Sequence, residues 1–70
     1  MGVKSQKEKA QSRMCAARIA KNMTQRELAE KTGLHRNTIA RIENGKRMPT
    51  LKTCLLIAEA LGSTVGDLFG

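Results

Sequence analysis

The chain has 70 residues, of which 13 are Lys or Arg, six are Asp or Glu and only one is aromatic, and its formal net charge is +7. This length allows one small domain, and the charge favours a polyanionic partner, either nucleic acid or an anionic membrane surface. No apolar run approaches the ~18 residues of a membrane span, so we expect no membrane partner.

Further classes are disfavoured by residue types that are scarce. Two cysteines and a single histidine form no metal-binding or nucleophile–base pattern, so we expect no enzyme, no metal and no cofactor. The cysteines, Cys15 and Cys54, are expected to be reduced apolar fillers, which suits a cytoplasmic protein. One aromatic side chain is too few for the stacking platforms of single-strand readers, so double-stranded DNA is favoured over RNA.

The positive charge is concentrated in the first two thirds of the chain. The net charge is +5 over residues 1–21, +3 over residues 22–47 and −1 over residues 48–70. We therefore expect the first two thirds to face the polyanion. The last third is the most apolar, and it is expected to supply core and a protein contact.

The first elements are a polar segment and two helices. Residues 1–9 are predicted to be a flexible basic arm, which either follows a DNA groove or is a solvated tail. A helix is predicted over residues 10–22. Thr24 and Glu27 have the spacing of a capping box, which predicts a second helix over 24–32 that ends at Gly33.

Three more helices are predicted in the remaining chain. One covers residues 36–44 and ends at Asn44-Gly45. Another covers 51–61, with Thr50 as its N-cap, and a short one covers 64–69. Nothing alternates with the period of a strand, so residues 10–70 are predicted to form one all-α domain of five helices. Its expected core residues are Met14, Met23, Leu28, Leu34, Ile39, Ile42, Leu51, Leu55, Ile57, Leu61, Val65 and Leu68.

The helix at 36–44 has an outer face suited to DNA. At about 100° per residue, Ile39 and Ile42 point inward, while Asn37, Arg41 and Asn44 lie on the opposite side. Arg pairs with guanine edges and Asn with adenine edges, and this exposed face has no acidic residue. The two helices 24–32 and 36–44 have the spacing of a helix-turn-helix, whose second helix enters the major groove.

Longer motifs carry a family resemblance. Residues 24–33 read TQRELAEKTG, residues 38–45 read TIARIENG, and Pro49-Thr50-Leu51 follows. Over residues 14–69 the chain resembles the Cro/cI (XRE-type) helix-turn-helix family of phage repressors and bacterial regulators. This resemblance implies a five-helix, lambda-repressor-like bundle, in agreement with the helices predicted above.

The resemblance also implies roles for particular residues. Arg18 and Glu43 would form a structural ion pair, and Gln25 would hold a phosphate and brace the recognition helix. The family's base-reading positions correspond to Arg36, Asn37, Thr38 and Arg41. The phosphate-binding positions correspond to Gln25, Asn44, Lys46 and Arg47, with Arg26 as an additional basic residue where many relatives are acidic or neutral.

These observations predict a sequence-specific transcriptional regulator, a small repressor or controller that binds an inverted repeat as a homodimer. Leu56, Val65 and Phe69 are the candidates for the dimer surface, with Leu56 and Phe69 expected in an exposed apolar patch. No site for a small-molecule effector is expected, because the chain stops after the last helix. The alternatives are an autoregulating antitoxin and a protein-interaction or coactivator module of the same fold. The expected location is the cytoplasm, at the nucleoid when DNA is bound.

Overall fold

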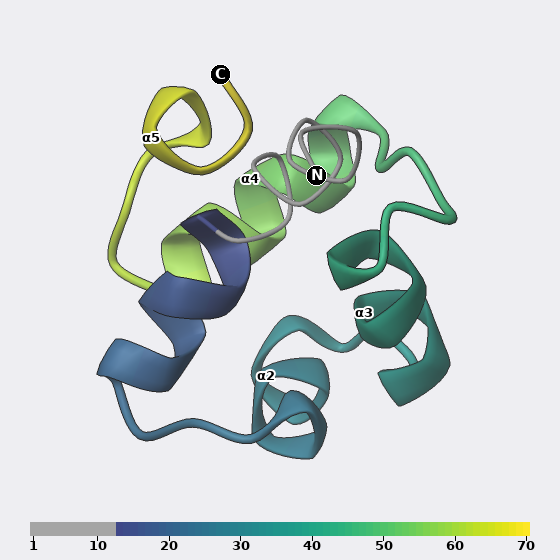
Figure 1. Cartoon of the computed structure of the whole chain (residues 1–70), viewed down its shortest axis with the longest axis vertical. Helices are drawn as coiled ribbons and strands as arrows, with labels where there is room; N and C mark the ends of the chain where they lie inside the picture. The colour runs from purple at the N-terminus through teal and green to yellow at the C-terminus, as the bar shows by residue number, and fades with distance from the viewer. Residues whose placement is uncertain (1–12) are drawn as a thin grey trace, which may run out of the picture.

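A computed structural model describes residues 13–70, which form five helices and no strand (Figure 1). The first helix occupies residues 13–20 of the described part. The others are α2 (Gln25–Thr32), α3 (Arg36–Glu43), α4 (Leu51–Ala60) and α5 (Val65–Phe69). The prediction of an all-α fold is confirmed. The predicted arm at 1–9 and the predicted start of the first helix lie outside the described residues.

The helix ends differ from the predicted ones by one or two residues. The first helix stops at residue 20 instead of 22, because Asn22 takes a left-handed φ of 55° that turns the chain. The helices predicted to end at 44 and 61 end at 43 and 60, and those predicted to start at 24 and 64 start one residue later. In the last two cases the threonine is an N-cap with extended backbone angles.

Threonine caps start three of the helices. The Thr24 hydroxyl accepts from the Glu27 backbone N–H at 3.0 Å, and the Thr24 backbone N–H donates to the Glu27 carboxylate at 2.8 Å. This is the capping box that the sequence predicts. Thr50 and Thr64 likewise accept from backbone N–H groups three residues on. Local hydrogen bonds therefore fix the starting points of α2, α4 and α5 before any tertiary contact is considered.

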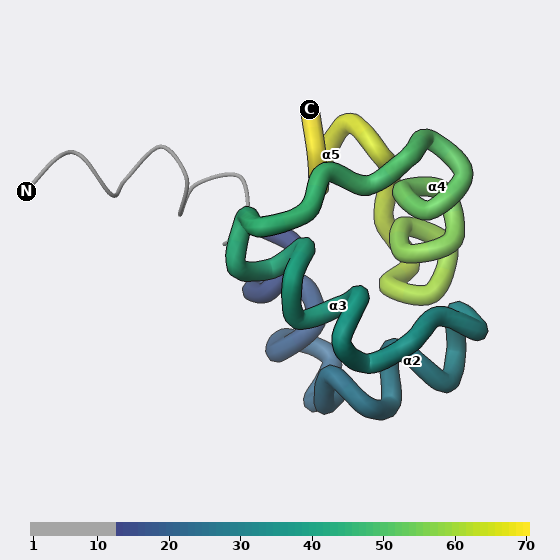
Figure 2. Tube along the Cα trace, turned by 90° about the vertical axis from the view of Figure 1, so that its right-hand side faces the viewer, coloured from purple at the N-terminus to yellow at the C-terminus, as the bar shows by residue number. Residues whose placement is uncertain are grey.

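One core joins all five helices. The largest fully buried side chains are one from each helix, namely Met14, Leu28, Ile39, Ile57 and Leu68. These side chains belong to one buried cluster, and Figure 2 shows the helices arranged around a common centre. The buried set is completed by Ala29, Ile42, Cys54, Ala58 and Leu61, and burial raises the pKa of the Cys54 thiol.

The predicted core is wrong in the first half of α4. Leu51 is 68% exposed and Leu55 is 54% exposed, whereas Leu56, expected outside, is half-buried. The inward face of α4 is set by Cys54, Ile57 and Ala58, which turns Leu51 and Leu55 outward. The exposed apolar patch expected at Leu56 and Phe69 therefore lies elsewhere, since Phe69 packs against the core.

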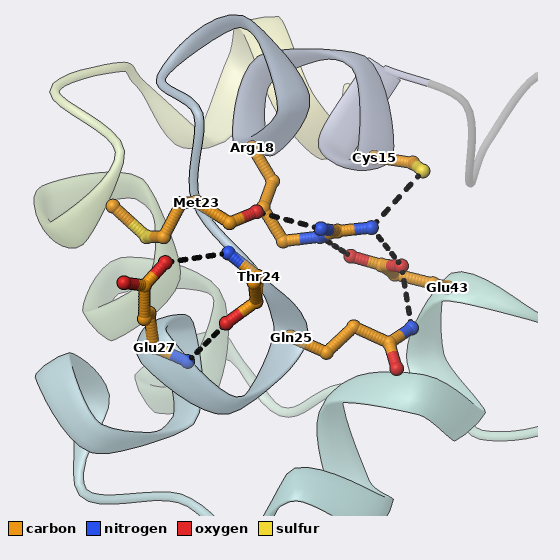
Figure 3. Close-up of polar contacts among 7 residues, drawn as sticks. All are labelled: Cys15, Arg18, Met23, Thr24, Gln25, Glu27 and Glu43. Carbon is orange, nitrogen blue, oxygen red and sulfur yellow. Dashed lines mark hydrogen bonds and ion pairs between the residues drawn. The ribbon is translucent and has the colours of Figure 1, made fainter.

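A buried carboxylate fixes the position of α3 (Figure 3). Arg18 donates to Glu43 through Nε at 2.7 Å and Nη2 at 3.2 Å, and Gln25 donates to it through Nε2 at 2.9 Å. Arg18 also donates from Nη1 to the Met23 carbonyl at 2.7 Å. The side chains of Arg18 and Glu43 are only 12% and 5% exposed. Glu43 thus ties the end of α3 to the first helix and to the start of α2.

We expect Glu43→Gln to lower the free energy of unfolding by about 3 kcal/mol, because it leaves the Arg18 guanidinium buried without a counter-charge. Urea unfolding followed by circular dichroism measures this change. Glu30→Gln is the matched control, since Glu30 is exposed on α2 and should change stability by less than about 0.5 kcal/mol. Equal losses for the two variants would show that the Glu43 contacts contribute nothing specific.

Two glycines should respond to alanine in opposite directions. Gly33 ends α2 with a φ of 76°, so Gly33→Ala should destabilise the fold by about 1 kcal/mol although the space around it is open. Gly66 lies within α5 at an ordinary φ, and a Cβ there would meet only the Thr64 hydroxyl at 3.9 Å. Gly66→Ala should therefore stabilise by up to about 1 kcal/mol. Thermal unfolding of both variants checks the signs, and a shift in the same direction would contradict this account.

Candidate nucleic-acid interface

A tight turn connects α2 to α3. Gly33 and Leu34 both donate backbone N–H groups to the Ala29 carbonyl, the latter at 3.1 Å. The Thr32 hydroxyl donates to the Leu28 carbonyl at 2.9 Å, which keeps this polar side chain folded back on its own helix. His35 is the N-cap of α3, but its side chain makes no capping hydrogen bond. The two helices and this turn form the helix-turn-helix unit.

The two faces of α3 differ sharply in chemistry. Ile39 and Ile42 are buried, as predicted, and Glu43 is buried with them. Arg36, Asn37 and Arg41 are exposed, and Thr38 is half-buried beside them. Because Glu43 is the sole acid of α3, the exposed face carries two guanidinium groups and an amide without any negative charge. Such a face can donate to base edges and attract phosphates.

The ion pair also removes Arg18 from the positive surface. Its hydrogen bond to Glu43 raises the pKa of the Arg18 guanidinium above its ordinary value, so Arg18 stays charged and its charge is spent on this ion pair. In residues 13–70 this is the one ion pair, so no acid in that part of the chain neutralises the other basic side chains described there. The Cys15 thiol, which was not predicted as a neighbour of this pair, lies 3.5 Å from Arg18 Nη2.

The residues predicted to bind phosphate lie on either side of α3. Asn44, Lys46 and Arg47 are exposed just after α3, and Arg26 is exposed in the first turn of α2. Gln25 is half-buried, and its amide nitrogen is engaged by Glu43, which leaves its carbonyl oxygen without a partner among residues 13–70. The structure thus places Gln25 as a brace for α3.

A shallow hollow of about 740 Å³ lies between the first helix and α3. Arg26 and Arg36, which come from different helices, both line it. It therefore brings together two residues predicted to bind phosphate, Gln25 and Arg26, and one predicted to read bases, Arg36. The remaining lining residues are Arg18, Ile19, Asn22, Met23 and Thr24.

The residues predicted for a dimer surface lie away from this face. Leu56, Val65 and Phe69 are all half-buried, and the last two pack against the core. Within residues 13–70, no helix is long and apolar enough to cross a membrane, and no group of three His, Cys, Asp or Glu is placed to hold a metal ion.

Comparisons of sequence connect this chain to known regulators. A family model described as helix-turn-helix matches residues 16–68. The chain is 44% identical over 52 residues to an uncharacterised helix-turn-helix-type transcriptional regulator of Methanocaldococcus jannaschii, a match that covers 74% of this chain and 79% of that protein. It is 43% identical over 47 residues to the control protein C.SmaI of Serratia marcescens, which covers 67% of this chain and 56% of that protein.

A solved structure is similar over almost the whole length. The restriction-modification controller protein C.AhdI from Aeromonas hydrophila superposes with a TM-score of 0.85 at 32% identity, covering 93% of this chain and 98% of that one. The clp gene regulator ClgR from Corynebacterium glutamicum gives a TM-score of 0.81 at 26% identity, covering 89% of this chain and 66% of that one. The chain thus belongs to the Cro/cI-type helix-turn-helix family, whose members are DNA-binding transcriptional regulators and not enzymes.

Proposed function

We propose that this protein is a homodimeric regulator that binds an inverted-repeat operator and places α3 in the major groove of each half-site. The observation that carries the proposal is the composition of the exposed face of α3, which is basic and free of acid because Glu43 is buried against Arg18. In a two-fold dimer the two α3 helices would enter successive major grooves, about 34 Å apart.

Recognition would depend on two groups of residues, one that reads bases and one that binds phosphates. Arg36, Asn37, Thr38 and Arg41 would read bases, since their side chains lie on or beside the exposed face of α3. A second group would set register through phosphate contacts, without sequence information of its own. Its members are Gln25, Arg26, Asn44, Lys46 and Arg47. Because the free carbonyl oxygen of Gln25 can only accept, it would reach a phosphate through a bridging water.

The similarity to the controller C.AhdI favours a role as a small controller or repressor. C.AhdI covers nearly the same length as this chain and shares its fold, and C.SmaI is also named a control protein. We therefore place this protein among small controllers or repressors that act in the cytoplasm, at the nucleoid, without a cofactor or effector. An autoregulating antitoxin would use the same DNA contacts. A coactivator module that touches no DNA would have no need for an acid-free α3.

Selection from a random DNA duplex library at two salt concentrations tests the function. We expect enrichment of an inverted repeat with half-sites about one helical turn apart, with affinity that falls steeply as salt increases. Binding without enrichment would leave only a non-specific basic domain. Absence of binding at both salt concentrations would refute DNA recognition.

The selected operator then separates base reading from phosphate binding. Arg41→Ala should lose about 1–3 kcal/mol of discrimination at one base pair, because the guanidinium can bond a guanine edge in two places. Lys46→Ala should weaken every duplex alike and lower the salt slope by about one. Lys31→Ala, which removes an exposed lysine in the last turn of α2, is the matched control and should change neither. Fluorescence anisotropy on single-base variants of the operator measures these effects. An equal loss of affinity on every duplex for Arg41→Ala would show that Arg41 binds phosphate and does not read a base.

A further inference from the structure

One helix face is apolar, exposed and unassigned by DNA recognition. Leu51 and Leu55 stand one turn apart on α4 and are 68% and 54% exposed, and the half-buried Leu56 adjoins them. Figure 2 shows α4 along one side of the molecule. Adjacent large apolar side chains left in water mark interaction surfaces more often than isolated ones do.

The charges on α4 surround these leucines in a symmetric way. Lys52 and Glu59 are the two charged residues of the helix, and both are exposed. They are seven residues apart, so they lie within about 20° of each other around the axis and about 10 Å apart along it. The ion pair Arg18–Glu43 is the sole one in residues 13–70, so neither charge has an opposite partner in that part of the chain.

This pattern is complementary to itself. The midpoint between Lys52 and Glu59 falls between Leu55 and Leu56, and a two-fold axis placed there would bring each lysine opposite the glutamate of the other copy. Resting on the homodimer of the proposed function, we propose that α4 pairs antiparallel with α4 of a second copy. Leu55 and Leu56 form the centre, two Lys52–Glu59 ion pairs flank it, and Leu51 lies at the edge of the contact. Contacts across such an axis are isologous, as the repeated pair requires.

The same pattern argues against an unrelated partner. An acidic protein would match Lys52 and be repelled at Glu59, and a basic one would do the reverse. Nucleic acid would be repelled at Glu59 and would gain nothing from the leucines. The proposed pairing also uses none of the residues predicted to bind DNA, because α3 and the exposed residues Arg26, Lys46 and Arg47 are not part of α4.

The apolar centre is tested first, without DNA. Sedimentation velocity over a range of concentrations should show a dimer of the full chain, and Leu55→Glu should weaken dimerisation on the order of a hundredfold, since both copies lose a buried leucine. Ile19→Glu is the matched control: Ile19 is 59% exposed on the first helix and should leave the dimer unchanged. Thermal unfolding verifies that both variants are folded.

Charge reversal tests the antiparallel arrangement. Lys52→Glu and Glu59→Lys should each weaken the homodimer about tenfold, because like charges then face each other twice. An equimolar mixture of the two variants should recover wild-type affinity as a heterodimer, since both opposing pairs become attractive again. Parallel pairing would bring like positions together, and neither single reversal would then weaken the dimer. That result, or a failure of the mixture to recover, overturns the proposal.

The outcomes stay separate from those of the DNA experiments. A wild-type chain that remains monomeric at every concentration overturns the α4 pairing. That result is also expected if residues 1–12 of the same chain cover the leucines. Enrichment of a half-site in the selection would still support DNA recognition. A dimer that depends on Leu55, Lys52 and Glu59 but binds no duplex supports the pairing and refutes the DNA function.

Discussion

The position of α3 depends on one carboxylate. Glu43 accepts hydrogen bonds from Arg18 on the first helix and from Gln25 at the start of α2, so three helices converge on two oxygen atoms. Apolar packing by Ile39 and Ile42 holds α3 against the core but tolerates small shifts along the helix axis. Hydrogen bonds of 2.7–3.2 Å do not, because they weaken steeply with distance and angle.

The same carboxylate shapes the electrostatics of the DNA-facing side. An acid on a helix meant for the major groove would repel phosphates, and here it is turned inward and neutralised by Arg18. The cation that neutralises it comes from outside α3, so Arg36 and Arg41 remain unpaired in the described part of the chain. The framework of the bundle and the charge of its binding surface are therefore set by one interaction, and neither can be altered independently at Glu43.

The sequence indicated local features better than tertiary ones. The capping box at Thr24 and the end of α2 at Gly33 depend on hydrogen bonds and backbone angles within a few residues, so the sequence alone predicts them. The two faces of α3 were also readable, because Ile39 and Ile42 fix its phase. The phase of α4 was not, since Leu51, Leu55, Leu56 and Ile57 make most of its circumference apolar. Tertiary contacts, among them those with α2 and α5, decide which leucines are covered. No motif marks Cys15, although its position three residues before Arg18 on the predicted first helix makes the two side chains neighbours.

Because each helix contributes one fully buried side chain to the shared centre, no subset of helices encloses a complete core. Loss of one helix leaves this shared centre open, so folding of so small a domain is cooperative. Partly folded forms with an intact α3 are consequently scarce. The population able to read DNA then equals the population that is folded, and any substitution that loosens the centre reduces the active concentration of the regulator without touching a DNA contact.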